Sequence, residues 1–282
     1  MPNIDTLVTD MYNVFDKLHG GQEDLFKLFG DGLNDTMRVR LTEQRKNGYL
    51  RLSNIGKPDR QLWYAINDPD GDEKLPPQAH IKFMYGDMQE HLCIMLAKLA
   101  GHEVTDEQKE VVVNGIPGHI DGRIDGHVVD VKSASRFAFS KFSQGTLLEP
   151  GNDAFGYIGQ LAAYVHAVTP GKDGYILAVN KDLGHLALLK IDAEILAKYN
   201  IEARIDYAKD MVNGQIPDRC YPDVPDGKSG NMKLDTGCSY CSRKFNCWDD
   251  LKTYYYSNGP RYLTKVVKEP KVQSEFPVDL QE

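Results

Sequence analysis

The segment from His119 to Lys132 constrains the fold more than any other part of the sequence. It contains two short runs of mixed apolar and polar residues that are typical of β-strands, separated by Asp125-Gly126. Asp-Gly between two such runs is a strong signal for a two-residue hairpin turn. We therefore expect strands over 119–124 and 127–131, and a fold built around a β-sheet.

The register of this hairpin places charged side chains side by side. Counting back from the turn along both strands puts Asp121 opposite Asp130 and His119 opposite Lys132. Opposed residues have Cβ atoms about 5 Å apart, and like charges at that range destabilise a sheet. A hard divalent cation such as Mg²⁺ or Mn²⁺ would offset the repulsion, because it favours carboxylate oxygens.

Lys132 lies two residues past Asp130 and therefore on the same face of the strand. There it could polarise or deprotonate a metal-bound water, or stabilise negative charge on a phosphate. An ordinary solvated sheet face with a cross-strand salt bridge is the alternative interpretation. Gly118, ahead of Asp121, would let backbone or ligand approach closely.

Two predicted helices add polar side chains to this set. In the helix expected over residues 81–99, Glu90 lies one turn after Gly86, whose missing side chain would leave space beside a third metal ligand. In the helix expected after the hairpin, Gln160 and Tyr164 are four residues apart and share a face. Gln160 could orient the water or the lysine, and Tyr164 could contact a phosphate or a base. A polar helix face and an amphipathic boundary pair are the simpler alternatives.

The other periodic segments predict further helices and strands around this centre. We expect helix over 1–50 with breaks at 20–21 and 30–32, strands over 111–116, 175–179 and 185–191, helix over 154–168 and 193–213, and an irregular stretch over 217–237.

Composition limits the classes of function. The net charge of −8 argues against a surface that coats nucleic acid everywhere, but it allows a local basic groove. Candidate DNA contacts are Arg136, Lys141 and Arg60; a second basic group is Arg38, Arg40, Arg45, Lys46 and Arg51, and ordinary solvated charges are the alternative for each. The sequence has no long apolar run and no signal-peptide pattern, so we expect a soluble, cytoplasmic protein.

Four of the five cysteines cluster in the last quarter of the chain: Cys220, Cys238, Cys241 and Cys247. Without a secretion signal, such clustering indicates a metal centre before it indicates disulfides. Thiolates from a tight loop bind either an iron–sulfur cluster or Zn²⁺, and their spacing alone does not distinguish the two. Cys93 stands alone and is interpreted as a buried thiol.

Taken together, these motifs resemble the PD-(D/E)XK nucleases of the RecB-like branch, especially its CRISPR-associated and phage-encoded exonucleases. The resemblance covers roughly residues 51–248 and is carried by four motifs in series, which are Gly86-x-x-x-Glu90, Gly118-His119-Ile120-Asp121, Asp130-Val131-Lys132 and Gln160-x-x-x-Tyr164. It implies an α/β fold, with a central mixed sheet flanked by helices, and phosphodiester hydrolysis that depends on Mg²⁺ or Mn²⁺.

The resemblance also implies a role for each residue. Glu90, Asp121 and Asp130 would bind the metal, Lys132 would be catalytic, and Gln160 and Tyr164 would support them. Many relatives have His where this chain has Glu90, and Asp130 stands in place of the commoner Glu.

The cysteines match the same relatives with one departure. The spacing Cys238-x2-Cys241-x5-Cys247 is that of RecB-like nucleases with a C-terminal 4Fe-4S cluster. Their first cysteine precedes the nuclease core in a segment like Cys-x-Arg-x-x-Trp-Tyr, where this chain has Pro58. Cys220 is the expected replacement, with an iron–sulfur cluster slightly ahead of zinc. The centre would staple the C-terminal segment onto the fold.

The expected function is a DNA exonuclease in recombination, replication or repair, encoded by a phage. It would act on single-stranded DNA or duplex ends, with other replication or recombination proteins as further expected partners. The alternatives are a structure-specific endonuclease and an inactive nucleic-acid-binding module. We expect four regions: a helical accessory region (1–78), the nuclease core (79–216), a cysteine-rich segment (217–265) and a flexible tail (266–282).

Overall fold

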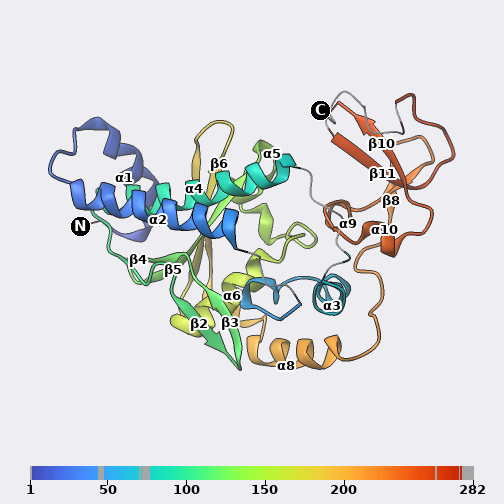
Figure 1. Cartoon of the computed structure of the whole chain (residues 1–282), viewed down its shortest axis with the longest axis horizontal. Helices are drawn as coiled ribbons and strands as arrows, with labels where there is room; N and C mark the ends of the chain where they lie inside the picture. The colour runs from blue at the N-terminus through green and yellow to red at the C-terminus, as the bar shows by residue number, and fades with distance from the viewer. Residues whose placement is uncertain are drawn as a thin grey trace. The chain divides into compact units, whose positions relative to one another are not determined.

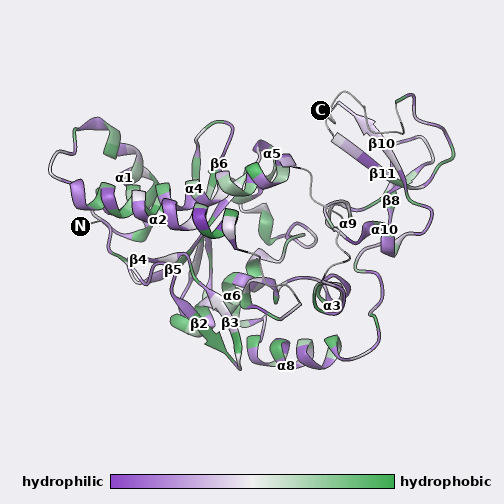
Figure 2. Cartoon of the chain, in the orientation of Figure 1, coloured by the Kyte–Doolittle hydropathy of each residue, from purple (hydrophilic) through white to green (hydrophobic). Residues whose placement is uncertain are grey.

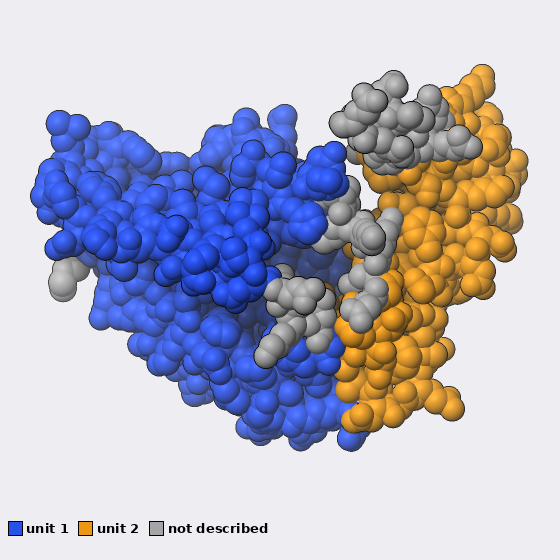
Figure 3. Space-filling view, in the orientation of Figure 1, with its two compact units in different colours: residues 1–56, 75–210 blue, residues 57–74, 211–282 orange. Residues whose placement is uncertain are grey.

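The computed structural model describes residues 2–43, 48–69, 71, 77–257, 259–272 and 274. The chain forms two compact units, each assembled from two stretches of sequence (Figure 3). Unit 1 comprises Met1–Gly56 and Leu75–Asp210, and unit 2 comprises Lys57–Lys74 and Met211–Glu282. The four-region division remains a prediction, and most of its proposed tail (273 and 275–282) lies outside the described residues.

Unit 1 is built on a five-stranded mixed sheet in the order β1-β4-β5-β6-β7 (Figure 1). Strands β5 and β6 are parallel, and the other neighbours are antiparallel. The strands are β1 Val104–Thr105, β4 Gly122–Ile124, β5 His127–Ala134, β6 Gly174–Asn180 and β7 Leu186–Ile191. The expected mixed α/β fold with a central sheet and flanking helices is confirmed.

Helices cover both faces of this sheet. Helices α1 (Leu7–Asn13) and α4 (Pro77–Leu99) pack on one face, where Leu7 and Leu96 join Val129 and Val131 in an apolar core. Helix α6 (Tyr157–Val168) contacts β5 and β6. Because both faces are covered, every residue of β6 is buried.

The hairpin β4–β5 forms around the predicted turn, but its first strand begins at Gly122 and not at His119 as expected. Ile124 pairs with His127, and the turn residues Asp125 and Gly126 have φ values of 50° and 79°. A type I′ turn needs positive φ at both positions, which Asp and Gly tolerate better than most residues. The ladder extends to Gly122 opposite Val129, so Asp121 lies one residue beyond it.

A second hairpin replaces the single strand expected over 111–116. Strands β2 (Glu110–Val113) and β3 (Ile116–His119) pair around Asn114-Gly115, whose φ values of 46° and 77° again fit a type I′ turn. Figure 2 shows β2 as largely hydrophobic. The two strands form a sheet of their own, in which His119 pairs with Glu110. The expectation that His119 lies opposite Lys132 is therefore wrong.

Two helix predictions also need correction. Helix α2 (Glu23–Thr42) runs through Gly30-Asp31-Gly32 without the expected break, because its packing against α4 outweighs the weak helix propensity of glycine. The helix expected over 193–213 is two helices, α7 (Ala193–Ala197) and α8 (Ile201–Val212). Asn200 separates them with a φ of 39°.

The remaining elements of unit 1 are short. They are 3-10 helices η1 (Ile4–Thr6), η2 (Val14–Asp16), η3 (Leu52–Asn54) and η4 (Thr146–Leu148), and helix α5 (Arg136–Ser143). No helix in the described part of the chain is both long enough and apolar enough to cross a membrane.

Unit 2 has a four-stranded antiparallel sheet in the order β10-β11-β9-β8, with Tyr254, Leu263 and Leu234 buried. Its strands are β8 Val224–Pro225, β9 Met232–Lys233, β10 Lys252–Tyr256 and β11 Gly259–Lys265. Its helices are α3 Asp59–Asn67, α9 Thr236–Ser239 and α10 Lys244–Cys247. The stretch 217–237, expected to be irregular, thus contains two very short paired strands.

Candidate active site

Hydrogen bonds and charge interactions within unit 1 connect all six side chains singled out from the sequence. Helix α4 carries Glu90, and the connection between β3 and β4 carries Asp121. Strand β5 carries Asp130 and Lys132, and helix α6 carries Gln160 and Tyr164. The candidate site therefore draws on four separate elements of one unit.

Asp130 and Lys132 form the centre of the site. Lys132 Nζ lies 2.6 Å from Asp130 Oδ2, and the Asp130 side chain is only 1% exposed. Their neighbours Val129 and Val131 point into the apolar core with α1 and α4. The alternation of the strand thus sends Asp130 and Lys132 to the opposite face, beside α6.

Asp121 continues the register of the hairpin although it is not in the strand. Its Oδ2 accepts a 2.7 Å hydrogen bond from the backbone N–H of Val131. Burial and the nearby Asp130 raise the pKa of Asp121 to about 7. The charge repulsion inferred from the register is therefore present in the folded protein.

Glu90 adds a third carboxyl group. Burial, with added repulsion from Asp121 and Asp130, raises the pKa of Glu90 to about 9. The side-chain amide of Gln108 donates a hydrogen bond to Glu90 Oε1. A methyl group at Gly86 would meet only Ser133 Cβ, at 3.8 Å, so this glycine is not needed to make space.

The charge of Lys132 depends on the two aspartates. Burial alone lowers the pKa of Lys132, but the carboxylates of Asp130 and Asp121 outweigh it and raise the pKa above its ordinary value. The ammonium also lies 5.3 Å from the ring centroid of Tyr157, within cation–π range. Lys132 is therefore a protonated donor in this arrangement.

Gln160 and Tyr164 hold Asp130 from α6. Gln160 Nε2 donates to Asp130 Oδ1 at 3.2 Å and to the Tyr164 hydroxyl at 3.3 Å. Tyr164 is 2% exposed, and burial raises the pKa of its hydroxyl above the ordinary range. The tyrosine is thus buried within unit 1, and its contact with a phosphate or a base stays a prediction.

Gly118 is required by packing within the chain. A Cβ there would lie 2.7 Å from Leu52 Cβ and 3.0 Å from Tyr164 Cε1. The close approach expected at this glycine is real, but the chain's own side chains make it.

The donor set fits a hard divalent cation, because the carboxylate of Asp130 lies near enough to Glu90 and Asp121 to raise the pKa of both. Each is turned toward a hydrogen-bond donor: Glu90 toward Gln108, Asp121 toward Val131, and Asp130 toward Lys132 and Gln160. Among the residues that the structure describes, no three His, Cys, Asp or Glu side chains converge enough to hold a metal ion. A cation would have to draw these carboxylates together.

Sequence reasoning did not find Gln108 or Tyr157. Gln108 lies in the connection between β1 and β2, and Tyr157 is the first residue of α6. Neither belongs to a motif, and only the folded chain brings them to Glu90 and Lys132.

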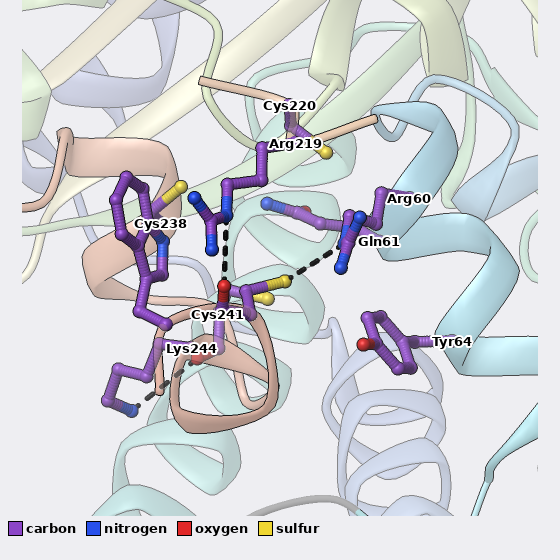
Figure 4. Close-up of a pocket in the computed structure, with 10 residues that line it drawn as sticks. Arg60, Gln61, Tyr64, Arg219, Cys220, Cys238, Cys241 and Lys244 are labelled. Atoms are coloured by element: carbon purple, nitrogen blue, oxygen red, sulfur yellow. Dashed lines mark hydrogen bonds between the residues drawn. The ribbon is translucent and has the colours of Figure 1, made fainter. Parts of the chain in front are cut away.

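The four clustered cysteines line one pocket in unit 2 (Figure 4). The pocket lies between α3, which contributes Arg60, Gln61 and Tyr64, and the segments that carry Cys220, Cys238, Cys241 and Cys247. All five cysteines of the chain are free thiols, and Cys93 is buried as expected. Burial and the neighbouring thiols raise the pKa of Cys238 to about 12.

The Cys220 side chain lies beside the first residues of α3, a helix whose N-cap is Pro58. The backbone N–H groups of Arg60 and Gln61 hydrogen-bond the Cys220 thiol. Arg60 Nε also donates to Cys247 Sγ at 3.2 Å. The RecB-like nucleases that this sequence resembles have their first cysteine at the start of the corresponding segment. In this chain, the start of α3 instead contacts Cys220, which lies much later in the sequence.

The three candidate DNA contacts have different surroundings. Arg136 is the first residue of α5, and Lys141 Nζ donates to the Asn152 carbonyl at 2.9 Å. Arg60 donates to the Pro217 carbonyl at 2.8 Å as well as to Cys247. The guanidinium of Arg60 is thus engaged in the cysteine pocket. Arg45 and Lys46 of the second basic group lie outside the described residues.

Comparison with known proteins gives only distant likenesses. No family model matches the chain, and no curated protein matches its sequence. Among solved structures, SSO0001 is 14% identical, with 78% of this chain and 96% of that chain covered and a TM-score of 0.42. An alkaline exonuclease from Laribacter hongkongensis, LHK-Exo, is 14% identical, with 57% of this chain and 91% of that chain covered and a TM-score of 0.35. Its complex with dAMP is 13% identical, with 57% and 92% covered and a TM-score of 0.36.

Proposed function

We propose that this protein is a metal-dependent DNA nuclease of the PD-(D/E)XK type that hydrolyses phosphodiester bonds. The observation that carries the proposal is the 2.6 Å pair of Asp130 and Lys132, buried on one face of β5 beside Asp121 and Glu90. Three carboxyl groups that repel one another destabilise the fold unless a bound cation offsets their repulsion. DNA is the proposed partner.

Each residue has a distinct task in this proposal. Glu90, Asp121 and Asp130 would hold Mg²⁺ or Mn²⁺. When bound, such a cation supplies a water of lowered pKa and screens charge on a phosphate. Lys132, kept protonated by its carboxylate neighbours, donates a hydrogen bond to the negative charge that develops on the phosphate oxygens. Gln160 fixes the carboxylate of Asp130, and Tyr164 in turn accepts a bond from Gln160.

The motif resemblance favours an exonuclease that acts on single-stranded DNA or duplex ends, in recombination, replication or repair. A structure-specific endonuclease would use the same residues. A module that only binds nucleic acid would have no use for three mutually repelling carboxyl groups, and this argues for catalysis.

The test is cleavage of DNA labelled separately at its 5′ and 3′ ends, with linear and circular forms compared. We expect Mn²⁺-dependent release of short products from linear DNA and no cleavage of circles. Cleavage of circular DNA would show that the protein is an endonuclease and not an exonuclease. Intact DNA in every form, with Mg²⁺ or Mn²⁺ supplied, would refute the nuclease.

For unit 2 we propose a structural four-cysteine centre, with 4Fe-4S ahead of Zn²⁺. Support comes from the four thiols that line one pocket, and from the bonds that Cys220 receives at the start of α3. Among the described residues the thiols do not yet converge enough to hold a metal, so the centre would have to draw them together. An absorption band near 400 nm would identify an iron–sulfur cluster. A colourless protein with stoichiometric zinc would replace it with a zinc site, and a protein with neither metal would refute the centre.

A further inference from the structure

Gln108 makes two hydrogen bonds that reach two of the proposed metal ligands. Its side-chain amide donates to Glu90 Oε1. Its backbone N–H donates to the Asp121 carbonyl at 3.3 Å. Because Glu90 comes from α4 and Asp121 from the β3–β4 connection, Gln108 ties together two ligands that no secondary-structure element holds in common.

The backbone around Gln108 is held in an unfavourable conformation. Gln108 has a φ of 50°, in a left-handed region that few residues other than glycine, asparagine and aspartate adopt, and Asp106, two residues before it, has a φ of 55°. Such conformations persist only where the surroundings enforce them, and they cluster at functional sites. Here Asp106 is held by Arg123 Nε at 2.7 Å and by Lys109 Nζ at 3.1 Å.

We infer that Gln108 is a positioning residue that orients the Glu90 carboxylate for the divalent cation. The inference rests on the proposed nuclease function. An amide that donates to one carboxylate oxygen fixes the rotation of the group and leaves the second oxygen for a cation. Removal of such an outer hydrogen-bond partner typically lowers metal affinity by about 10- to 100-fold. Glu90, the one ligand on a helix and not beside the hairpin, has the greatest need of such support.

The test is calorimetric titration of Mn²⁺ into wild type, Gln108→Ala and Gln108→Gly. Alanine removes the amide and keeps the strained backbone, whereas glycine removes the amide and relaxes it. We expect both variants to bind Mn²⁺ about 10- to 100-fold more weakly than wild type. DNA cleavage should recover when Mn²⁺ is raised to saturation.

Asn114→Gly is the matched control. Asn114 also has positive φ, in the β2–β3 turn of the same unit, and its carbonyl rather than its side chain accepts a bond from Lys209. This variant should bind Mn²⁺ as wild type does. If Gln108→Gly also binds as wild type does, the side chain has no positioning role and the inference is overturned.

The two proposals fail in different ways. If wild type binds Mn²⁺, the Gln108 variants bind it more weakly, and neither wild type nor any variant cleaves DNA, the nuclease is refuted and the positioning role is supported. If wild type cleaves DNA and the Gln108 variants keep its Mn²⁺ affinity, only the positioning role is refuted. A wild type that does not bind Mn²⁺ refutes both.

Discussion

Two carboxyl groups of the site make the metal-free protein sensitive to pH. The folded pKa of Glu90 is about 9 and that of Asp121 about 7, whereas the ordinary values are 4.5 and 3.8. Carboxyl groups with raised pKa contribute stability that is fully present below their unfolded pKa and is lost as pH rises through the folded pKa.

We therefore expect the free energy of unfolding of the metal-free protein to fall between pH 5 and pH 9. The slope has an upper limit of about 1.4 kcal/mol per pH unit for each group. Urea unfolding in EDTA across this range measures it. Glu90→Gln should make the decrease in the free energy of unfolding shallower in the upper part of this pH range. Added Mn²⁺ should reduce the decrease in the wild-type protein. An unchanged profile in Glu90→Gln would show that Glu90 ionises normally.

At the scale of single residues, the sequence sufficed for the hairpin centre and not for its supports. The Asp125-Gly126 turn dictates which residues oppose each other, so Asp121, Asp130 and Lys132 could be found by counting. Gln108 reaches Glu90 from a loop, and loop conformations leave no periodic signal in sequence.

At the scale of elements, we predict opposite effects on stability for alanine substitutions at two glycines near the site. A Cβ at Gly118 would lie 2.7 Å from Leu52 Cβ, whereas one at Gly86 would meet only Ser133 at 3.8 Å. Gly118→Ala should destabilise the protein by about 1–3 kcal/mol through overpacking. Gly86→Ala should be neutral or stabilise α4 by up to about 1 kcal/mol. Thermal unfolding of both variants checks the pair, and equal effects would contradict the packing described for β3 and α6.

Elements were predicted well where one signal dominated and poorly where two competed. The sequence Asn114-Gly115 does carry a hairpin signal, but the apolar residues on both sides read as one continuous strand. In α2 the glycines suggested a break, yet each costs only about 1 kcal/mol in a helix, less than tertiary packing provides.

At the scale of the whole molecule, the sequence order hides how the units are composed. Residues 57–74 belong with residues 211–282 in unit 2, although 136 residues of unit 1 lie between them. No local pattern reveals such a pairing, and only the cysteine resemblance pointed to it. In the folded chain, the hydrogen bonds from the backbone of α3 to Cys220 join these two stretches of sequence.

Cys220 should therefore be needed to retain the metal that we propose for unit 2. We expect Cys220→Ala to lower the iron or zinc content and the unfolding temperature, because thiolate ligation contributes directly to folding. Cys93→Ala is the control, since Cys93 is buried in the core of unit 1. Metal content by mass spectrometry is the measurement, and full metal occupancy in Cys220→Ala would exclude this cysteine as a ligand.

The central claim is that Asp130 and Lys132, on one face of β5, form the centre of a hydrolytic site. Single-turnover cleavage of end-labelled DNA in saturating Mn²⁺, with wild type compared with Lys132→Ala, tests it most directly. The account predicts a loss in rate of about 100-fold or more with DNA binding retained, because Lys132 stabilises charge that develops only during reaction. Equal rates for the two proteins would contradict it.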